Sequence, residues 1–94
     1  MSLIISKKIV KNFYKAELFY KLHKAKECIK LFEAKYGKSF KEFEKDVKTS
    51  PENFEAWDDY MEWKACIKEF ETVNKLLKEL ENGNIEVPWK VWSG

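Results

Sequence analysis

The sequence contains no arginine, and all 18 of its basic residues are lysines. It therefore lacks the planar guanidinium group that binds phosphate or guanine in a bidentate manner, which weakens the case for sequence-specific reading of nucleic acid. Glycine and proline are also scarce, at three and two residues, while hydrophobic residues make up 45%. This composition excludes a disordered or turn-rich chain and favours a helical domain.

The residues that usually carry catalysis are equally few. The chain has one histidine, His23, and contains no CxxC, HxxxH or glycine-rich phosphate loop. Its 94 residues suffice for one domain with a modest core and exclude a two-domain enzyme. We therefore expect a protein that is not an enzyme and has no metal and no cofactor, with His23 at the surface.

The two cysteines bear on the compartment. The apolar run Leu3-Ile4-Ile5 is too short for an export signal or a membrane span, so we expect a cytoplasmic protein with no membrane partner. In a reducing compartment, Cys28 and Cys66 are expected as packed free thiols, with a disulfide as the alternative. If Tyr36 pairs with Ala56 across an antiparallel hairpin, the two cysteines lie at one level.

Charge divides the chain into two halves. Residues 1–48 hold 13 lysines and 6 acids, and residues 49–94 hold 5 lysines and 10 acids, although the net charge is only +2. The halves should attract each other, so that lysines of the first half lie partly beside acids of the second.

The first long helix is predicted over residues 7–36. No glycine or proline interrupts this stretch, and Gly37 follows it as a C-terminal cap. Apolar residues recur every three or four positions and form one helical stripe: Val10, Tyr14, Leu18, Leu22, Ala25, Ile29, Phe32 and Tyr36.

Two further helices are predicted. Ser39 and Glu42 form a capping box for a short helix that ends near Lys48. A long helix over residues 51–82 follows, with Ser50 as its N-cap or with a later start near Asp58. Its apolar seam runs through Tyr60, Trp63, Ile67, Phe70, Asn74 and Leu77. Asn74 either fixes the register of this seam or lies at its edge in water.

The predicted fold is all-α. Residues 1–83 form a single helical domain, which is a long antiparallel helical hairpin with a short intervening helix. Residues 84–94 form an extended C-terminal arm, because their apolar residues alternate and Pro88 restricts them to an edge strand or an extended segment.

Both long helices carry a second apolar face. Ile9, Phe13, Ala16, Tyr20 and Leu31 lie opposite the first stripe, and Phe54, Met61 and Ala65 lie opposite the second. A lone hairpin buries one face of each helix, so the short helix, the arm, a second copy or another protein must cover the rest. A second copy would give a homodimeric four-helix bundle.

Two stretches of the chain, AKYGKSFKEFE at residues 34–44 and WDDYMEWKA at residues 57–65, resemble small archaeal and bacterial antitoxin-like proteins of type II toxin–antitoxin systems. The resemblance implies a protein that sequesters a cognate toxin of the ribonuclease type. The chain shows no DNA-binding strand or helix-turn-helix at its start, so we expect neutralisation without promoter binding.

These observations predict a protein-binding module whose apolar flank and arm occlude the toxin. The candidate partner-binding residues are Phe13, Tyr20, Trp57, Asp58, Asp59, Met61, Glu62, Trp89 and Trp92. Of these, Asp58, Asp59 and Glu62 match acidic positions of the antitoxin-like motif. One alternative is a scaffold subunit that dimerises. Another is a weak nucleic-acid binder, which requires Lys7, Lys8, Lys11 and Lys15 to remain unpaired on one face.

Overall fold

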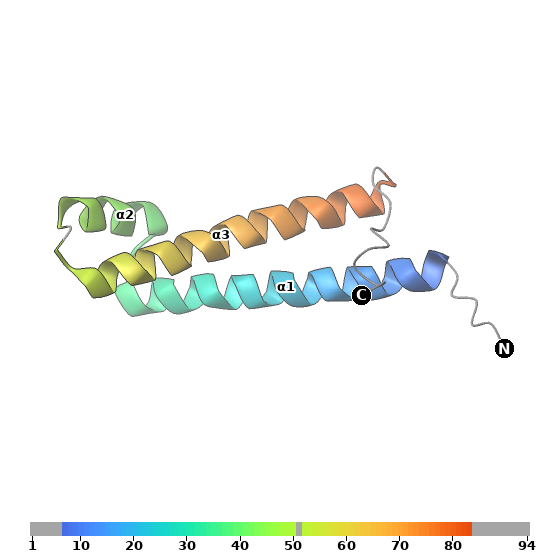
Figure 1. The fold of residues 1–94 in the computed structure, drawn as a ribbon, viewed down its shortest axis with the longest axis horizontal. Helices are drawn as coiled ribbons and strands as arrows, with labels where there is room; N and C mark the ends of the chain where they lie inside the picture. Colours follow the sequence, from blue (N-terminus) through green and yellow to red (C-terminus); the bar gives the residue numbers. More distant parts are fainter. Residues whose placement is uncertain (1–6, 51, 84–94) are drawn as a thin grey trace.

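The structure is a computed structural model that describes residues 7–50 and 52–83. Three helices make up this part of the chain: α1 (Lys7–Tyr36), α2 (Phe40–Thr49) and α3 (Phe54–Glu81). Helices α1 and α3 lie side by side and antiparallel, and the short α2 packs against the first half of α3 (Figure 1). The predicted all-α hairpin with a short intervening helix is thus confirmed. The predicted arm, residues 84–94, lies outside the described residues.

Local chemistry explains where α1 ends and α2 begins. Gly37 has a φ of +63°, a left-handed conformation that glycine adopts at little cost, and its N–H donates to the carbonyl of Glu33 at 2.8 Å. The Ser39 hydroxyl accepts a hydrogen bond from the backbone N–H of Glu42 at 3.3 Å. The predicted turn and cap are therefore confirmed.

The predicted start of α3 was wrong. Asn53 is its N-cap, since the Asn53 side chain accepts from the backbone N–H of Ala56 at 3.1 Å. Ser50, the expected cap, instead closes α2 by donating its backbone N–H to the carbonyl of Val47 at 3.2 Å. Both residue types are good caps, and Ser50 is taken up by the end of the preceding helix.

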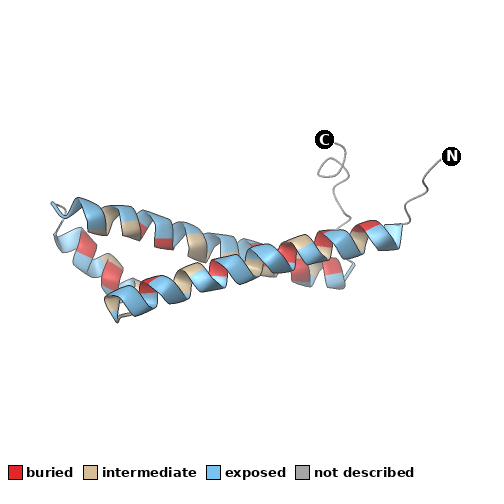
Figure 2. Cartoon of the chain, turned by 90° about the horizontal axis from the view of Figure 1, so that it is seen from below, coloured by how far each residue is buried: buried red, intermediate tan, exposed pale blue. Residues whose placement is uncertain are grey.

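The core consists of two clusters along the hairpin (Figure 2). At the open end the buried side chains are Tyr14, Leu18, Val73, Leu77 and Leu80. At the end closed by α2 they are Phe32, Phe43, Val47, Tyr60 and Trp63.

The predicted seam of α3 was therefore only partly right. Tyr60, Trp63 and Leu77 are buried, but Phe70 and Asn74 are half-buried, whereas Val73 and Leu80 are fully buried. The buried side of α3 turns along the helix because its first half packs against both α1 and α2, while its second half contacts α1 without α2.

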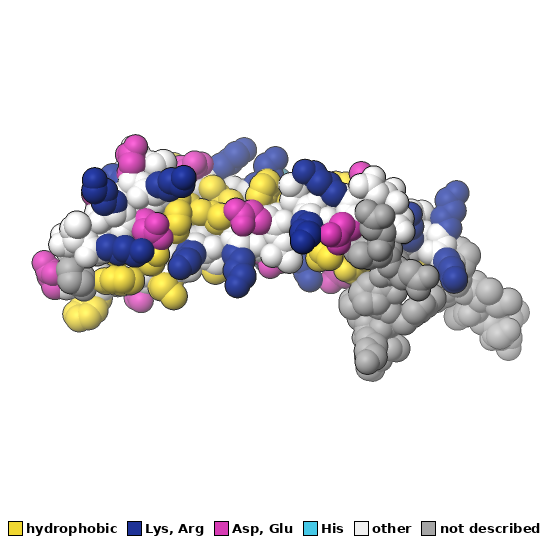
Figure 3. All heavy atoms as spheres, turned by 90° about the horizontal axis from the view of Figure 1, so that it is seen from above, with side chains coloured by type: hydrophobic (Ala, Val, Ile, Leu, Met, Phe, Trp, Pro, Cys, Tyr) yellow, Lys and Arg dark blue, Asp and Glu magenta, His cyan; other side chains and the backbone are white. Residues whose placement is uncertain are grey.

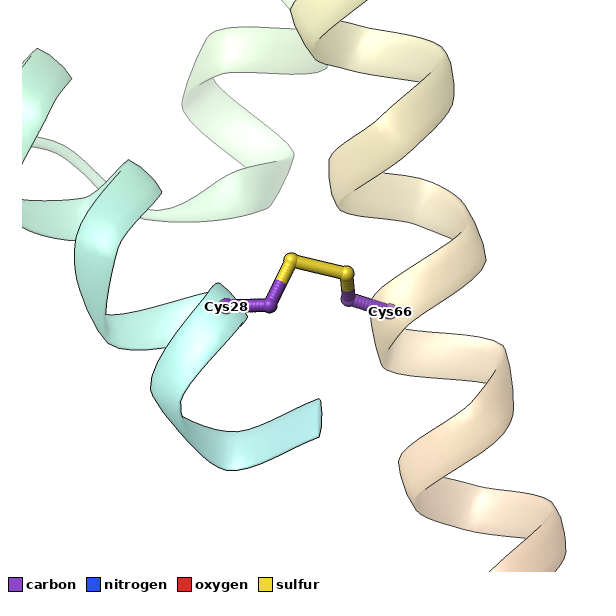
Figure 4. The surroundings of a disulfide bond; sticks show 2 residues. All are labelled: Cys28 and Cys66. Carbon is purple, nitrogen blue, oxygen red and sulfur yellow. A yellow bond between two sulfur atoms is a disulfide. The ribbon is translucent and has the colours of Figure 1, made fainter. Parts of the chain in front are cut away.

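A disulfide between Cys28 and Cys66 joins α1 to α3 between these two clusters (Figure 4). The expectation of free thiols was wrong, because the antiparallel register brings the two Cα atoms to 6.2 Å, within the range that a disulfide spans. The same bond confirms the predicted register, which placed the two cysteines at one level.

Candidate protein-binding surfaces

Polar contacts hold the closed end of the hairpin together. The Asp59 carboxylate accepts hydrogen bonds from the Lys35 ammonium at 2.6 Å and from the Tyr36 hydroxyl. Lys35 also lies 3.5 Å from Glu55, which confirms the expectation that lysines of the first half lie partly beside acids of the second. Asp59 was a candidate for partner binding, but its side chain is largely buried here and serves the fold.

These contacts shift the pKa values of the groups involved. The hydrogen bond from Lys35, with a second one from Tyr36, lowers the pKa of Asp59, because both donors favour the carboxylate. Burial, together with donation to Asp59, raises the pKa of Tyr36 to about 12. The Tyr36 phenol therefore stays protonated, and remains a donor, throughout the neutral range.

A second polar pair joins α2 to α3. The Tyr60 hydroxyl donates to Glu44 at 2.6 Å, which raises the pKa of Tyr60 and lowers that of Glu44. The ring of Tyr60 stacks on Phe40, with 5.6 Å between the centroids, and meets the edge of Trp57 at 5.5 Å. Trp57, another candidate, is therefore half-buried in the aromatic cluster.

Trp63 forms the centre of this cluster and is completely buried. Its indole stacks near Phe32, with 5.6 Å between the centroids, and Phe43 lies 5.3 Å away. Among the described residues, the indole N–H has no hydrogen-bond acceptor. Trp63 is thus a core residue, as its place in the predicted seam indicated.

One exposed apolar surface lies on the first half of α3. We call it the α3 outer face, and its residues are Phe54, Asp58, Met61 and Ala65, which fall within about 60° of the helix circumference. Phe54 is 81% exposed and Met61 is 58% exposed. The acidic side chains of Glu55, Asp58 and Glu62 are exposed beside them. The candidates Asp58, Met61 and Glu62 thus lie together on or beside one surface.

A second surface surrounds the disulfide. A groove of about 500 Å³ runs between α1 and α3, with the cystine, Ala25 and Ala65 as its apolar lining. Lys21 and Lys24 line it from α1, and Glu62 and Glu69 line it from α3. A neighbouring depression continues it past Leu31 and Lys35. We call this surface the disulfide face; it has a basic α1 side and an acidic α3 side.

Large apolar side chains of α1 flank the same face. Tyr20 is 62% exposed and Leu31 is 70% exposed, and both lie within about 80° of Cys28 around α1. Phe13, also exposed, falls in the same sector. Figure 3 shows one long side of the molecule, on which hydrophobic side chains appear between lysines and acidic residues.

Trp89 and Trp92 lie outside the described residues. His23 is exposed and contacts Glu27 at 3.1 Å, as expected for a surface residue. Within residues 7–50 and 52–83, no group of three or more His, Cys, Asp or Glu side chains could hold a metal ion. No helix in these ranges has the length and hydrophobicity needed to cross a membrane.

The disulfide face was not predicted, although the sequence carries a signal for it. Lys24 precedes Cys28 by one helical turn, and Glu69 follows Cys66 by about one turn. Once the cysteines are paired, these two residues must lie at one level on opposite sides of the groove. The signal was missed because the cysteines were interpreted as free thiols.

Comparison with known proteins adds one finding. No curated protein and no solved structure matches the chain. A family model, however, matches residues 2–85, which include all three helices. The chain therefore belongs to the uncharacterized protein MJ0235 family.

Proposed function

We propose that this chain is a non-enzymatic protein-binding module, and most concretely an antitoxin that sequesters a toxin of the ribonuclease type. The observation that carries the proposal is the α3 outer face. Phe54 and Met61 are seven residues apart, or two helical turns, and both are exposed. This is the spacing of anchor residues in helices that bind into a groove of another protein. Burying each side chain would contribute about 1.5–3 kcal/mol.

The charges around these anchors support a nuclease as the partner. A ribonuclease binds a polyanion, so its cleft carries basic residues. The exposed carboxylates of Glu55, Asp58 and Glu62 lie beside Phe54 and Met61 and would complement such a cleft. This acidic patch is local, since the whole chain has a net charge of +2.

We place this binding in the cytoplasm, where such a toxin would cleave RNA. Disulfides are uncommon in most cytoplasmic proteins, so the Cys28–Cys66 bond gives this part of the proposal its own test. Thiols are alkylated rapidly in intact cells, and the protein is then analysed by mass. Alkylated Cys28 and Cys66 would show a reducing compartment and support the cytoplasm, whereas an intact disulfide would count against it.

The test of function is inhibition of a nuclease. The protein is purified from its native host together with whatever remains bound, and the partner's RNA cleavage is measured with and without added chain. The double variant Phe54→Ala, Met61→Ala should weaken inhibition about 30-fold or more, which corresponds to about 2 kcal/mol. Phe19→Ala is the matched control, because Phe19 is also a half-exposed aromatic residue but lies on α1. A partner without RNA cleavage, or equal inhibition by both variants, would refute the proposal.

The C-terminal arm gives a separate test. If residues 84–94 add a strand to the partner, a chain that ends at residue 83 should lose binding while keeping its helical circular dichroism. Unchanged affinity would exclude a role for the arm and leave the α3 outer face as the binding surface.

The second candidate function is a scaffold subunit that dimerises permanently, which the charge pattern of the disulfide face favours.

Nucleic-acid binding is less well supported. It requires an unpaired lysine face at the start of α1, but Lys15 lies 4.0 Å from Glu81 of α3. A steep fall of RNA or DNA binding with salt would be the evidence in its favour.

A further inference from the structure

We propose that the disulfide face binds a second copy of the same chain, with α1 of each copy antiparallel to and over α3 of the other. The resulting dimer is a four-helix arrangement with the two cystines near its centre. This inference goes beyond the proposed function, because it concerns the disulfide face, which shares only Ala65 and the adjacent Glu62 with the α3 outer face.

The two sides of the disulfide face carry opposite charges. The α1 side of the groove carries Lys21 and Lys24, and the α3 side carries Glu62 and Glu69. Among the described residues, Lys24, Glu62 and Glu69 form no ion pair. Each copy thus has one basic edge and one acidic edge. Two copies are complementary in charge only if the basic edge of each lies over the acidic edge of the other.

Twofold symmetry limits how two such faces can meet. Two copies that meet face to face are related by a twofold axis lying in the contact plane. An axis across the hairpin would place α1 over α1 and oppose lysines to lysines. An axis along the hairpin places α1 over α3 and opposes lysines to glutamates. Because Lys24 and Glu69 lie at one level, the second arrangement brings Lys24 of each copy over Glu69 of the other.

The disulfide face also offers apolar area for a second copy. The cystine, Ala25 and Ala65 form the apolar part of the groove lining, and Leu31 lines the neighbouring depression. The exposed side chain of Tyr20 lies on the same side of α1 as Cys28. From Phe13 to Lys35 the face is about 33 Å long at the 1.5 Å rise per residue, and two adjacent helices make it about 20 Å wide, so it offers roughly 660 Å² per copy. This lies within the range of about 600–1,000 Å² per partner of a standard interface.

The experiment is a charge exchange on the isolated full-length chain, with mass measured by sedimentation equilibrium. The variant Lys21→Glu, Lys24→Glu makes all four charged residues that line the groove acidic, and the variant Glu62→Lys, Glu69→Lys makes all four basic. The wild type should be a dimer, and each variant alone should be a monomer with unchanged helical circular dichroism. An equimolar mixture of the two variants should form heterodimers, because both contact edges are then again of opposite charge.

The matched control is Lys26→Glu, Lys30→Glu. It makes the same charge change on exposed lysines of α1 that do not line the groove, and it should remain dimeric. A monomeric wild type overturns the proposal. So does a dimer that survives in both groove variants, which would place the contact elsewhere, or a mixture that stays monomeric. A dimeric wild type whose bound partner does not cleave RNA would overturn the proposed function alone.

Discussion

Removing the disulfide should lower the stability of the hairpin by about 4 kcal/mol. Cys28 and Cys66 are 38 residues apart, so the bond closes a loop of that length in the unfolded chain. The loop-entropy relation for n of about 38 gives roughly 13 cal/mol/K, or about 4 kcal/mol at room temperature. Small domains are typically stable by only about 5–15 kcal/mol, so this bond is a large share of the total.

Urea denaturation of the oxidised and the reduced protein, followed by circular dichroism, measures this difference. The midpoint should fall on reduction, and the melting temperature should drop by about 16–32 °C at 4–8 °C per kcal/mol. Cys28→Ala combined with Cys66→Ala is the control, because a reductant should not change the stability of that variant. The slope of the transition should rise when the bond is absent, since the unfolded chain is then less compact.

A difference below about 1 kcal/mol would refute this reasoning. It would mean that the packing of the two core clusters keeps the ends of the loop together even in the unfolded ensemble, so that the bond removes little chain entropy. A loss that prevents folding altogether would show that the clusters on either side of the cystine cannot hold the register alone.

Two other predictions concern the closed end. Asp59→Asn should cost about 1–2 kcal/mol in urea denaturation, because the carboxylate accepts from both Lys35 and Tyr36. The pKa of Asp59 is lowered from 3.8, so the stabilisation by its carboxylate is complete above that pH and is lost as the pH falls through the folded pKa. The variant should therefore lose less stability than the wild type on acidification. An equal loss of stability in the two proteins would contradict this. Trp63→Ala should lower the free energy of unfolding by about 3–5 kcal/mol. Trp63→Phe should lower it clearly less, since this change also removes a buried N–H that has no acceptor. Equal losses of stability in the two variants would contradict this.

The helices were predictable because their signals are local. Hydrophobic spacing and Gly37 fixed the bounds of α1, and the cap formed by Ser39 and Glu42 fixed the start of α2. The start of α3 was not predictable in the same way, because Ser50 and Asn53 are both good caps. Which of the two caps α3 depends on where α2 ends: α2 runs to Thr49, so Ser50 is its C-cap and Asn53 is the N-cap of α3.

The candidate surfaces were predictable only in part. The sequence placed Phe54 and Met61 opposite the seam of α3, and both are exposed. It could not show that Asp59 would be engaged by Lys35 and Tyr36, because that contact depends on how the long helices meet. Covalent pairing of the cysteines likewise follows from tertiary geometry and not from composition, which favoured free thiols.

The polar pairs at the closed end belong to the fold, so the candidate binding residues lie outside the core. Tyr36 with Asp59 and Tyr60 with Glu44 satisfy the half-buried hydroxyls where α2 closes the hairpin, and the described core contains no buried charged residue. The interior is therefore complete without Phe54, Met61, Tyr20 or Leu31. Exposed side chains of this size contribute little to folding and favour aggregation unless another surface covers them. This is why the proposed contacts with a toxin and with a second copy are placed on these side chains.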